Sequence, residues 1–161
     1  MKRKKKGVFF FKSSNPYEFY DLLNGKNMDD KQDVWGTLIF PENAKKPCPL
    51  IIPIHGSAGL REGHHTHMVN LLDAGFAIFR IHHFESRGVI SIVENQTEVT
   101  LASMITDAFR ALTLVSKHPD VDSDKIGIMG WSLGGSTAFY AAWQPIIDCL
   151  LYTSPSPRDD Q

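Results

Sequence analysis

The stretch KIGIMGWSLGG, residues 125–135, decides the fold of this chain. It begins with a short apolar run that is typical of a buried strand and continues directly into a Gly-x-Ser-x-Gly pattern centred on Ser132. The segment after the pattern is compatible with a helix. A serine between strand and helix must stand on a sharp turn, and only glycine at Gly130 and Gly134 leaves room for that turn. The pattern therefore predicts a serine nucleophile that faces the positive end of the following helix.

A second glycine-containing loop, HGSAG at residues 55–59, follows an earlier apolar run. An enzyme that transfers acyl groups needs two backbone N–H donors beside the oxygen of the carbonyl that it attacks. One donor is the residue after the nucleophile, Leu133, and the other comes from a loop after an earlier strand, for which we choose Ser57. We expect Gly56 to allow the close approach of this loop, and His55 to shape it through the backbone rather than to act as the catalytic base.

Predicted strands and helices alternate along the chain, which favours parallel βαβ units in a mostly parallel sheet with helices on both faces. Apolar, β-rich runs predict strands at residues 34–40, 50–54, 76–81 and 125–129. Helical spacing predicts helices over 65–73, with Gly75 as a left-handed cap, and over 101–115, with Pro119 as the stop. We interpret 13–33 as a surface lead-in with one helical turn at 17–23, 82–98 as a polar connection, and 120–124 as a turn.

Composition excludes several classes of protein. Hydrophobic residues make up 42% and charged residues 22%, so disordered and collagen-like chains are excluded, and no apolar run is long enough to span a bilayer. The net charge of −1 disfavours nucleic acid as a partner of the whole chain, and we expect neither nucleic acid nor a membrane as partner, although the basic start could contact a membrane surface or RNA. Two cysteines cannot form a multi-bridge framework, so we expect a cytoplasmic protein. Secretion is the alternative, because a basic start precedes the short apolar run at 8–11; a frayed basic terminus is the simpler interpretation.

No metal or cofactor is expected. His64, His65 and His67 lie close together, but the chain has no His-Glu-x-x-His pattern and no cysteine near them. We expect these three side chains to be solvated or to line the mouth of a site.

Taken together, the two loops make the chain similar to α/β-hydrolases of the dienelactone hydrolase type. The resemblance extends over about residues 34–147 and rests on 49–61, 73–88, 107–114 and 120–135. It implies a serine ester hydrolase for small esters or lactones, and Ser132 at a position where the family often has cysteine favours the carboxylesterase-like branch. A peptidase or acyltransferase of the same fold, or a binding module without catalysis, remains an alternative.

The resemblance also assigns residues at the substrate mouth. Where the family has Asp-x-x-x-Arg-Gly, this chain reads HHFESRG at 82–88, with histidine in place of the aspartate. Arg87 then either lines the substrate mouth or pairs with a carboxylate. Trp131, directly before the nucleophile, is expected to form a wall of the pocket or of the core.

The base and acid of a catalytic triad are missing from the chain. The family places both downstream of the nucleophile, whereas every histidine here precedes Ser132. A substitute base at His82 or His83 would have to reach the serine. We expect a lead-in at 1–33, a partial hydrolase domain at 34–148 that is inactive by itself, and a non-native tail at 149–161, because 149–159 resembles a translated sequencing adapter. The strand at 126–129 is then left at an open edge of the sheet. The oligomeric state stays open.

Overall fold

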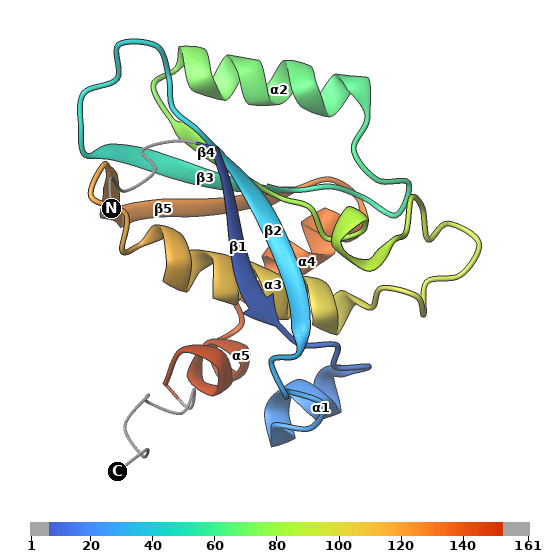
Figure 1. The fold of residues 1–161 in the computed structure, drawn as a ribbon. Coiled ribbons are helices and arrows are strands. Elements are labelled where there is room, and N and C mark those ends of the chain that lie inside the picture. The colour runs from blue at the N-terminus through green and yellow to red at the C-terminus, as the bar shows by residue number, and fades with distance from the viewer. Residues whose placement is uncertain (1–6, 153–161) are drawn as a thin grey trace.

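The computed structural model describes residues 7–152 and shows one sheet packed between helices (Figure 1). The strands are β1 (Gly7–Ser13), β2 (Gln32–Ile39), β3 (Cys48–Ile54), β4 (Ala77–Ile81) and β5 (Val121–Gly130). The α-helices are α1 (Phe19–Asn24), α2 (Glu62–Asp73), α3 (Leu101–Val115), α4 (Leu133–Ala141) and α5 (Gln144–Ile147). A 3₁₀ turn covers Glu85–Arg87, and a π-helical turn covers Asp148–Tyr152. None of the helices described is long and apolar enough to cross a bilayer.

The sheet has the strand order β1-β2-β4-β3-β5. Strand β3 pairs in parallel with β4 and β5, and β2 runs antiparallel to both of its neighbours. Four of the five described strands therefore run in one direction, which confirms the predicted mostly parallel sheet. As a consequence, β3, β4 and β5 end at the same edge of the sheet, and the loops that follow them meet there.

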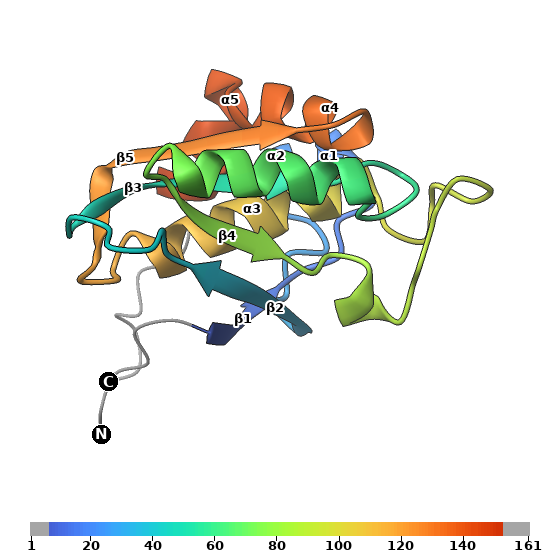
Figure 2. The ribbon, with the colours of Figure 1, turned by 90° about the horizontal axis from the view of Figure 1, so that it is seen from above.

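Helices cover both faces of the sheet. Helix α2 lies on one face, and α3 and α4 lie on the other (Figures 1 and 2). The core between sheet and helices contains fully buried side chains from β3, β4 and α3, such as Ile54, Phe79 and Met104. Helix α3 begins and ends where the apolar spacing predicted, since its buried face is continuous from Ala102 to Val115. This layered arrangement confirms the predicted fold class.

The N-terminal strand was not predicted, since residues 1–33 were expected to form a lead-in without a strand. β1 pairs with β2 along its whole length. Phe9 and Phe11 pack against the core, whereas Phe10 between them is 73% exposed, so the run has the alternation of a half-buried strand. Ser13 and Ser14, at its end, are fully buried. The basic residues before β1 lie outside the described residues.

The other differences concern the ends of elements. β5 begins at Val121 rather than after the expected turn, and α1 begins two residues and ends one residue later than predicted. Gly75 has a φ of +93°, as expected for its position after α2. β5 is the last strand of the described sheet, so its outer edge is unpaired there. Of the predicted tail, residues 149–152 form most of the π-helical turn, and the rest lies outside the described residues. Its foreign origin, like the domain boundaries, stays a prediction.

Candidate active site

Ser132 stands on a strained turn between β5 and α4. Its backbone has φ 52° and ψ −118°, a left-handed conformation that disfavours every residue except glycine. A Cβ on Gly130 would overlap the carbonyl of Gly134, and a Cβ on Gly134 would overlap the carbonyl of Ile54. The serine itself is exposed. The strand–turn–helix geometry is therefore the predicted one, and the two glycines are required by sterics.

Helix α4 presents its first N–H groups at this turn. The N–H of Gly134 donates to the carbonyl of Trp131 at 2.9 Å, and the N–H of Ser136 donates to the carbonyl of Ser132 at 3.1 Å. The N–H of Leu133 has no hydrogen-bond partner among the described residues. It is available to an oxygen placed next to the serine, and the positive end of the helix adds to its attraction for negative charge.

The loop at residues 55–59 lies against the serine. The N–H of Trp131 donates to the carbonyl of Ile54 at 3.1 Å, which ties the end of β5 to the end of β3. A Cβ built on Gly56 would lie 3.2 Å from the Cβ of Ser132 and 3.9 Å from its Oγ. The structure therefore brings together Ser132 and the loop of Ser57, as the sequence predicted.

The peptide group between Gly56 and Ser57 is held from its carbonyl side. The carbonyl oxygen of Gly56 accepts hydrogen bonds from Nδ1–H of His55 at 2.9 Å and from the N–H of Gly59 at 3.0 Å. In a trans peptide the C=O and the N–H point in opposite directions, so these bonds also fix the direction of the Ser57 N–H. That N–H has no partner among the described residues. His55 thus contacts the backbone as expected.

His55 is neutral at pH 7. Burial, with a smaller contribution from the neighbouring His83, lowers its pKa to about 4. A carbonyl oxygen can only accept, so the single ring proton of neutral His55 sits on Nδ1. The ring therefore keeps its hydrogen bond to Gly56 over the whole neutral pH range.

The connection after β4 holds the other side of the loop, a contact that the sequence analysis missed. The carbonyl of Ser57 accepts a hydrogen bond from the N–H of Ile92 at 2.8 Å and one from Oγ of Ser91 at 3.3 Å. Ile92 is fully buried in the core. Both peptide groups that flank Ser57 are consequently restrained, which is the preorganisation that an oxyanion site requires.

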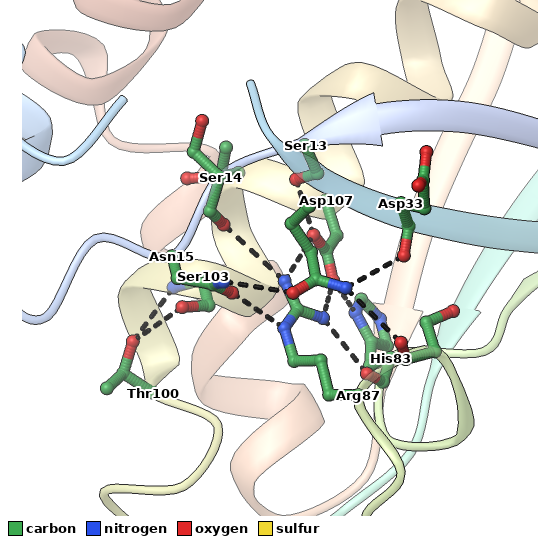
Figure 3. A network of polar contacts seen from close by, with 12 residues as sticks. Ser13, Ser14, Asn15, Asp33, His83, Arg87, Thr100, Ser103 and Asp107 are labelled. Atoms are coloured by element: carbon green, nitrogen blue, oxygen red, sulfur yellow. Dashed lines mark hydrogen bonds and ion pairs between the residues drawn. The ribbon is translucent and has the colours of Figure 1, made fainter. Parts of the chain in front are cut away.

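Below this loop, a buried ionic network is centred on Asp107 of α3 (Figure 3). Its carboxylate accepts two hydrogen bonds from the guanidinium of Arg87, at 2.8 and 2.9 Å, one from Nδ1 of His83 at 2.7 Å, and one from Oγ of Ser13 at 2.5 Å. Burial raises the pKa of Asp107, but the hydrogen bond from His83 and the charge of Arg87 outweigh it and hold the pKa below the usual value. Arg87 therefore adopts the carboxylate-paired alternative, and its contact with substrate stays a prediction.

Neither histidine that follows β4 bonds to the serine. His82 stacks on Trp35 with ring centroids 3.4 Å apart, and its nitrogens face Thr37 at 3.0 Å and Glu85 at 3.4 Å. His83 is fully buried against Asp107. Within residues 7–152 the Oγ of Ser132 has no hydrogen-bond partner, so the structure gives no support to a substitute base at these positions.

Trp131 packs against the histidines of α2. Its ring stacks on His64 with centroids 4.3 Å apart and an angle of 19°, and His67 lies 5.8 Å away. Nδ1 of His64 accepts a hydrogen bond from the N–H of Arg61 at 3.1 Å, which caps α2. These histidines thus hold the tryptophan beside the serine, and no group of three possible metal ligands is found in the described part of the chain.

Comparisons with known proteins agree with this fold. The model of the BD-FAE family matches residues 37–148, and no curated protein matches the chain. Est1E from Butyrivibrio proteoclasticus with ferulic acid bound is 28% identical, with a TM-score of 0.55, over 68% of this chain and 43% of that one. A dienelactone hydrolase-like promiscuous phosphotriesterase from metagenomic libraries is 18% identical, with a TM-score of 0.58, over 84% and 54%. An acetyl xylan esterase from Paenibacillus sp. R4 is 20% identical, with a TM-score of 0.57, over 88% and 46%.

The chain spans about half the length of the solved structures that it matches. The two matches below 25% identity establish the fold alone. The family match is longer than half of the chain and includes the loop at 55–59, the network residues His83, Arg87 and Asp107, and the serine turn. This chain therefore belongs to the BD-FAE family and forms part of an α/β-hydrolase-type domain.

Proposed function

We propose that the chain carries the nucleophile and the oxyanion site of a serine ester hydrolase. The observation that carries the proposal is the approach of Gly56 to Ser132, with a virtual Cβ 3.2 Å from that of the serine. This approach supports the proposal because it joins the loop of Ser57 to the turn of Ser132 and Leu133, and the N–H groups of Ser57 and Leu133 have no partners in the described structure. Two free donors beside a strained serine are what acyl transfer requires.

In the proposed reaction, Oγ of Ser132 attacks the carbonyl carbon of an ester. Its proton passes to a base, and the carbonyl oxygen takes up negative charge between the N–H groups of Ser57 and Leu133. Collapse of this intermediate breaks the bond to the alcohol, which leaves with a proton, and water then releases the acid from the serine. No step requires a metal or a cofactor.

We propose a carboxylic ester of a small or aromatic acid as the substrate. The support is the 28% identity with Est1E, whose structure holds ferulic acid. An enzyme of this kind needs a wall beside the serine, and Trp131, stacked on His64, supplies an aromatic one.

We further propose that the 161-residue chain alone turns over esters very slowly. All seven histidines precede Ser132, and none of those in the described residues hydrogen-bonds to it. A serine without its base loses on the order of 10⁴ to 10⁶ in rate. Hydrolysis of p-nitrophenyl acetate should therefore be the same for the chain and for Ser132→Ala. A robust rate that Ser132→Ala abolishes would overturn the proposed inactivity.

The nucleophile is tested by supplying the base from outside. The chain is incubated with an alkyl fluorophosphonate, with and without 2-methylimidazole, and modified peptides are mapped by mass spectrometry. We expect base-dependent modification of Ser132, in which an Oγ–P bond forms and fluoride leaves, and none in Ser132→Ala. The matched control Ser136→Ala removes an exposed serine one turn along α4 and should change nothing. Absence of base-dependent labelling at Ser132 would favour a binding module instead.

A further inference from the structure

Two buried histidine rings meet beneath the oxyanion loop. His55 follows β3 and His83 follows β4, and their ring centroids lie 5.5 Å apart at an angle of 80°. The side chain of His83 is fully buried, and His55 is 3% exposed. The ring of Phe84, the residue after His83, also makes a T-shaped contact with His55, and the two ring centroids lie 4.4 Å apart. His55 is thus held by two consecutive residues of the connection after β4.

These ring contacts determine where Nδ1 of His55 points. Nδ1 bonds to the carbonyl of Gly56, whereas Nε2 is buried without a hydrogen-bond partner in the described structure. The bond to Gly56 is the single hydrogen bond of this imidazole in the described structure. The packed rings of His83 and Phe84 therefore supply the restraint that a second hydrogen bond would otherwise give.

His83 in turn is held by Asp107. The 2.7 Å hydrogen bond from Nδ1 of His83 to the carboxylate joins the loop after β4 to helix α3. The carboxylate cannot move toward or away from the ring, because Arg87 binds both of its oxygens and Ser13 binds one. Figure 3 shows His83 and Arg87 on the same carboxylate. A rigid chain of contacts thus runs from α3 through His83 to His55.

We propose that Asp107 and His83 are positioning residues of the oxyanion site. They act through the ring of His55 on the peptide group of Gly56 and Ser57, and so set the direction of the Ser57 N–H. The effect on catalysis rests on the proposed function, in which this N–H stabilises the oxyanion. The effect on His55 does not, because it concerns only the hydrogen bond to Gly56.

The alternative is that the network merely stabilises the fold, and two variants separate these roles. His83→Asn keeps an amide N–H in reach of Asp107 but removes the ring edge against His55. Ser13→Ala also removes one interaction of the network, yet leaves His83 and His55 untouched. Thermal unfolding measures how much stability each of the two variants loses. Any effect of His83→Asn on His55 beyond that of Ser13→Ala then belongs to positioning.

The primary measurement is NMR of the full chain with ¹⁵N-labelled histidine, in which His55→Gln assigns the His55 signals. In the unmodified chain we expect His55 to carry its proton on Nδ1, with slow exchange against solvent. This exchange should become at least about tenfold faster in His83→Asn and stay within about twofold in Ser13→Ala. A proton on Nε2 of His55 in the unmodified chain, or equal exchange in the two variants, would overturn the proposal, and the first of these needs no variant to fold.

Labelling of Ser132 by the fluorophosphonate with 2-methylimidazole gives the functional readout. We expect His83→Asn to slow it on the order of tenfold, less than the hundredfold or more for an oxyanion donor that is deleted outright. Loss of His55 protection without labelling of the unmodified chain would refute the proposed function and leave the coupling intact. Labelling that is as fast in His83→Asn as in Ser13→Ala would refute the positioning role and leave the nucleophile intact.

Discussion

Gly56 and Ser132 lie so close that a Cβ on the glycine would be 3.2 Å from the Cβ of the serine and 3.1 Å from the carbonyl oxygen of Trp131. The two residues are 76 positions apart in the chain and follow neighbouring parallel strands. Their contact joins the loop of Ser57 to the serine turn, so it sets the width of the site in which a carbonyl group would sit.

Gly56→Ala should widen this site. The contacts of the added methyl group with Trp131 and Ser132 would be shorter than ordinary van der Waals contacts, so the serine turn must shift by a few tenths of an ångström to accept it. We expect base-dependent labelling of Ser132 to slow about tenfold, with a loss of about 1 to 3 kcal/mol in the free energy of unfolding. Gly63→Ala is the control, since nothing lies within 4 Å of its Cβ. Equal labelling rates in the two variants would show that the approach of Gly56 is not critical.

Gly134 and Gly135 are adjacent but should respond very differently to alanine. A methyl group on Gly134 overlaps the backbone of Ile54, whereas one on Gly135 lies 3.3 Å from the nearest atom, the carbonyl oxygen of Gly130. We expect Gly134→Ala to lower the free energy of unfolding by at least about 3 kcal/mol or to prevent folding. Gly135→Ala should keep this free energy within about 1 kcal/mol of the unmodified chain. Urea unfolding curves measure both. A small cost for Gly134→Ala would mean that the turn can open away from β3.

Arg87→Met should be among the most destabilising changes outside the apolar core. It leaves Asp107 buried without its main counter-charge, at a cost of about 3 to 5 kcal/mol. The control is Lys12→Met, which breaks an ion pair with Asp33 whose side chains are 60% and 76% exposed, and should cost under about 1 kcal/mol. Urea unfolding at pH 7 compares the two. Similar costs would contradict the central place of Arg87 in the network.

Acid should destabilise the chain through His55. Its pKa is about 4 in the fold, against an ordinary value of 6.5, so below pH 6.5 the unfolded chain takes up a proton that the folded chain does not. The stability that neutral His55 contributes is therefore fully present above pH 6.5 and is lost as the pH falls toward 4. Between pH 7 and pH 5 the free energy of unfolding of the unmodified chain should fall by about 2 kcal/mol more than that of His55→Asn, because all other groups titrate in both. Equal losses in urea unfolding would contradict a neutral, buried His55.

Much of the site could be predicted from the sequence because its requirements are local. The turn at Ser132 needs glycine two residues before and two residues after, and the loop at 55–59 needs glycine to approach a neighbour. Such requirements leave residue patterns that can be recognised without a structure. The same holds for α3, whose apolar spacing and N-cap at Thr100 lie within one helix.

Other features depended on partners that are far away in the chain. β1 was missed because its apolar run at 8–11 is short and is cut off by Lys12, and the strand is stabilised by partners distant in the chain, through pairing with β2 and packing on Phe79. Arg87 had two equally reasonable roles, because a guanidinium suits a substrate and a carboxylate equally well. The burial of Asp107 could not be predicted, since nothing in a helical pattern shows which carboxylate will be buried.

The sequence by itself determined the strand–turn–helix at Ser132, the loop of Ser57 and the class of fold, because each depends on backbone conformation within a few residues. Only the tertiary structure decided that Asp107 forms the ion pair with Arg87, which lies 20 residues before it. It also decided that the rings of His83 and His55 make a T-shaped contact. The physical reason is burial. A charge or an imidazole inside a protein must find its partner wherever the fold brings one within about 3 Å, and the distance along the chain places no limit on where that partner is.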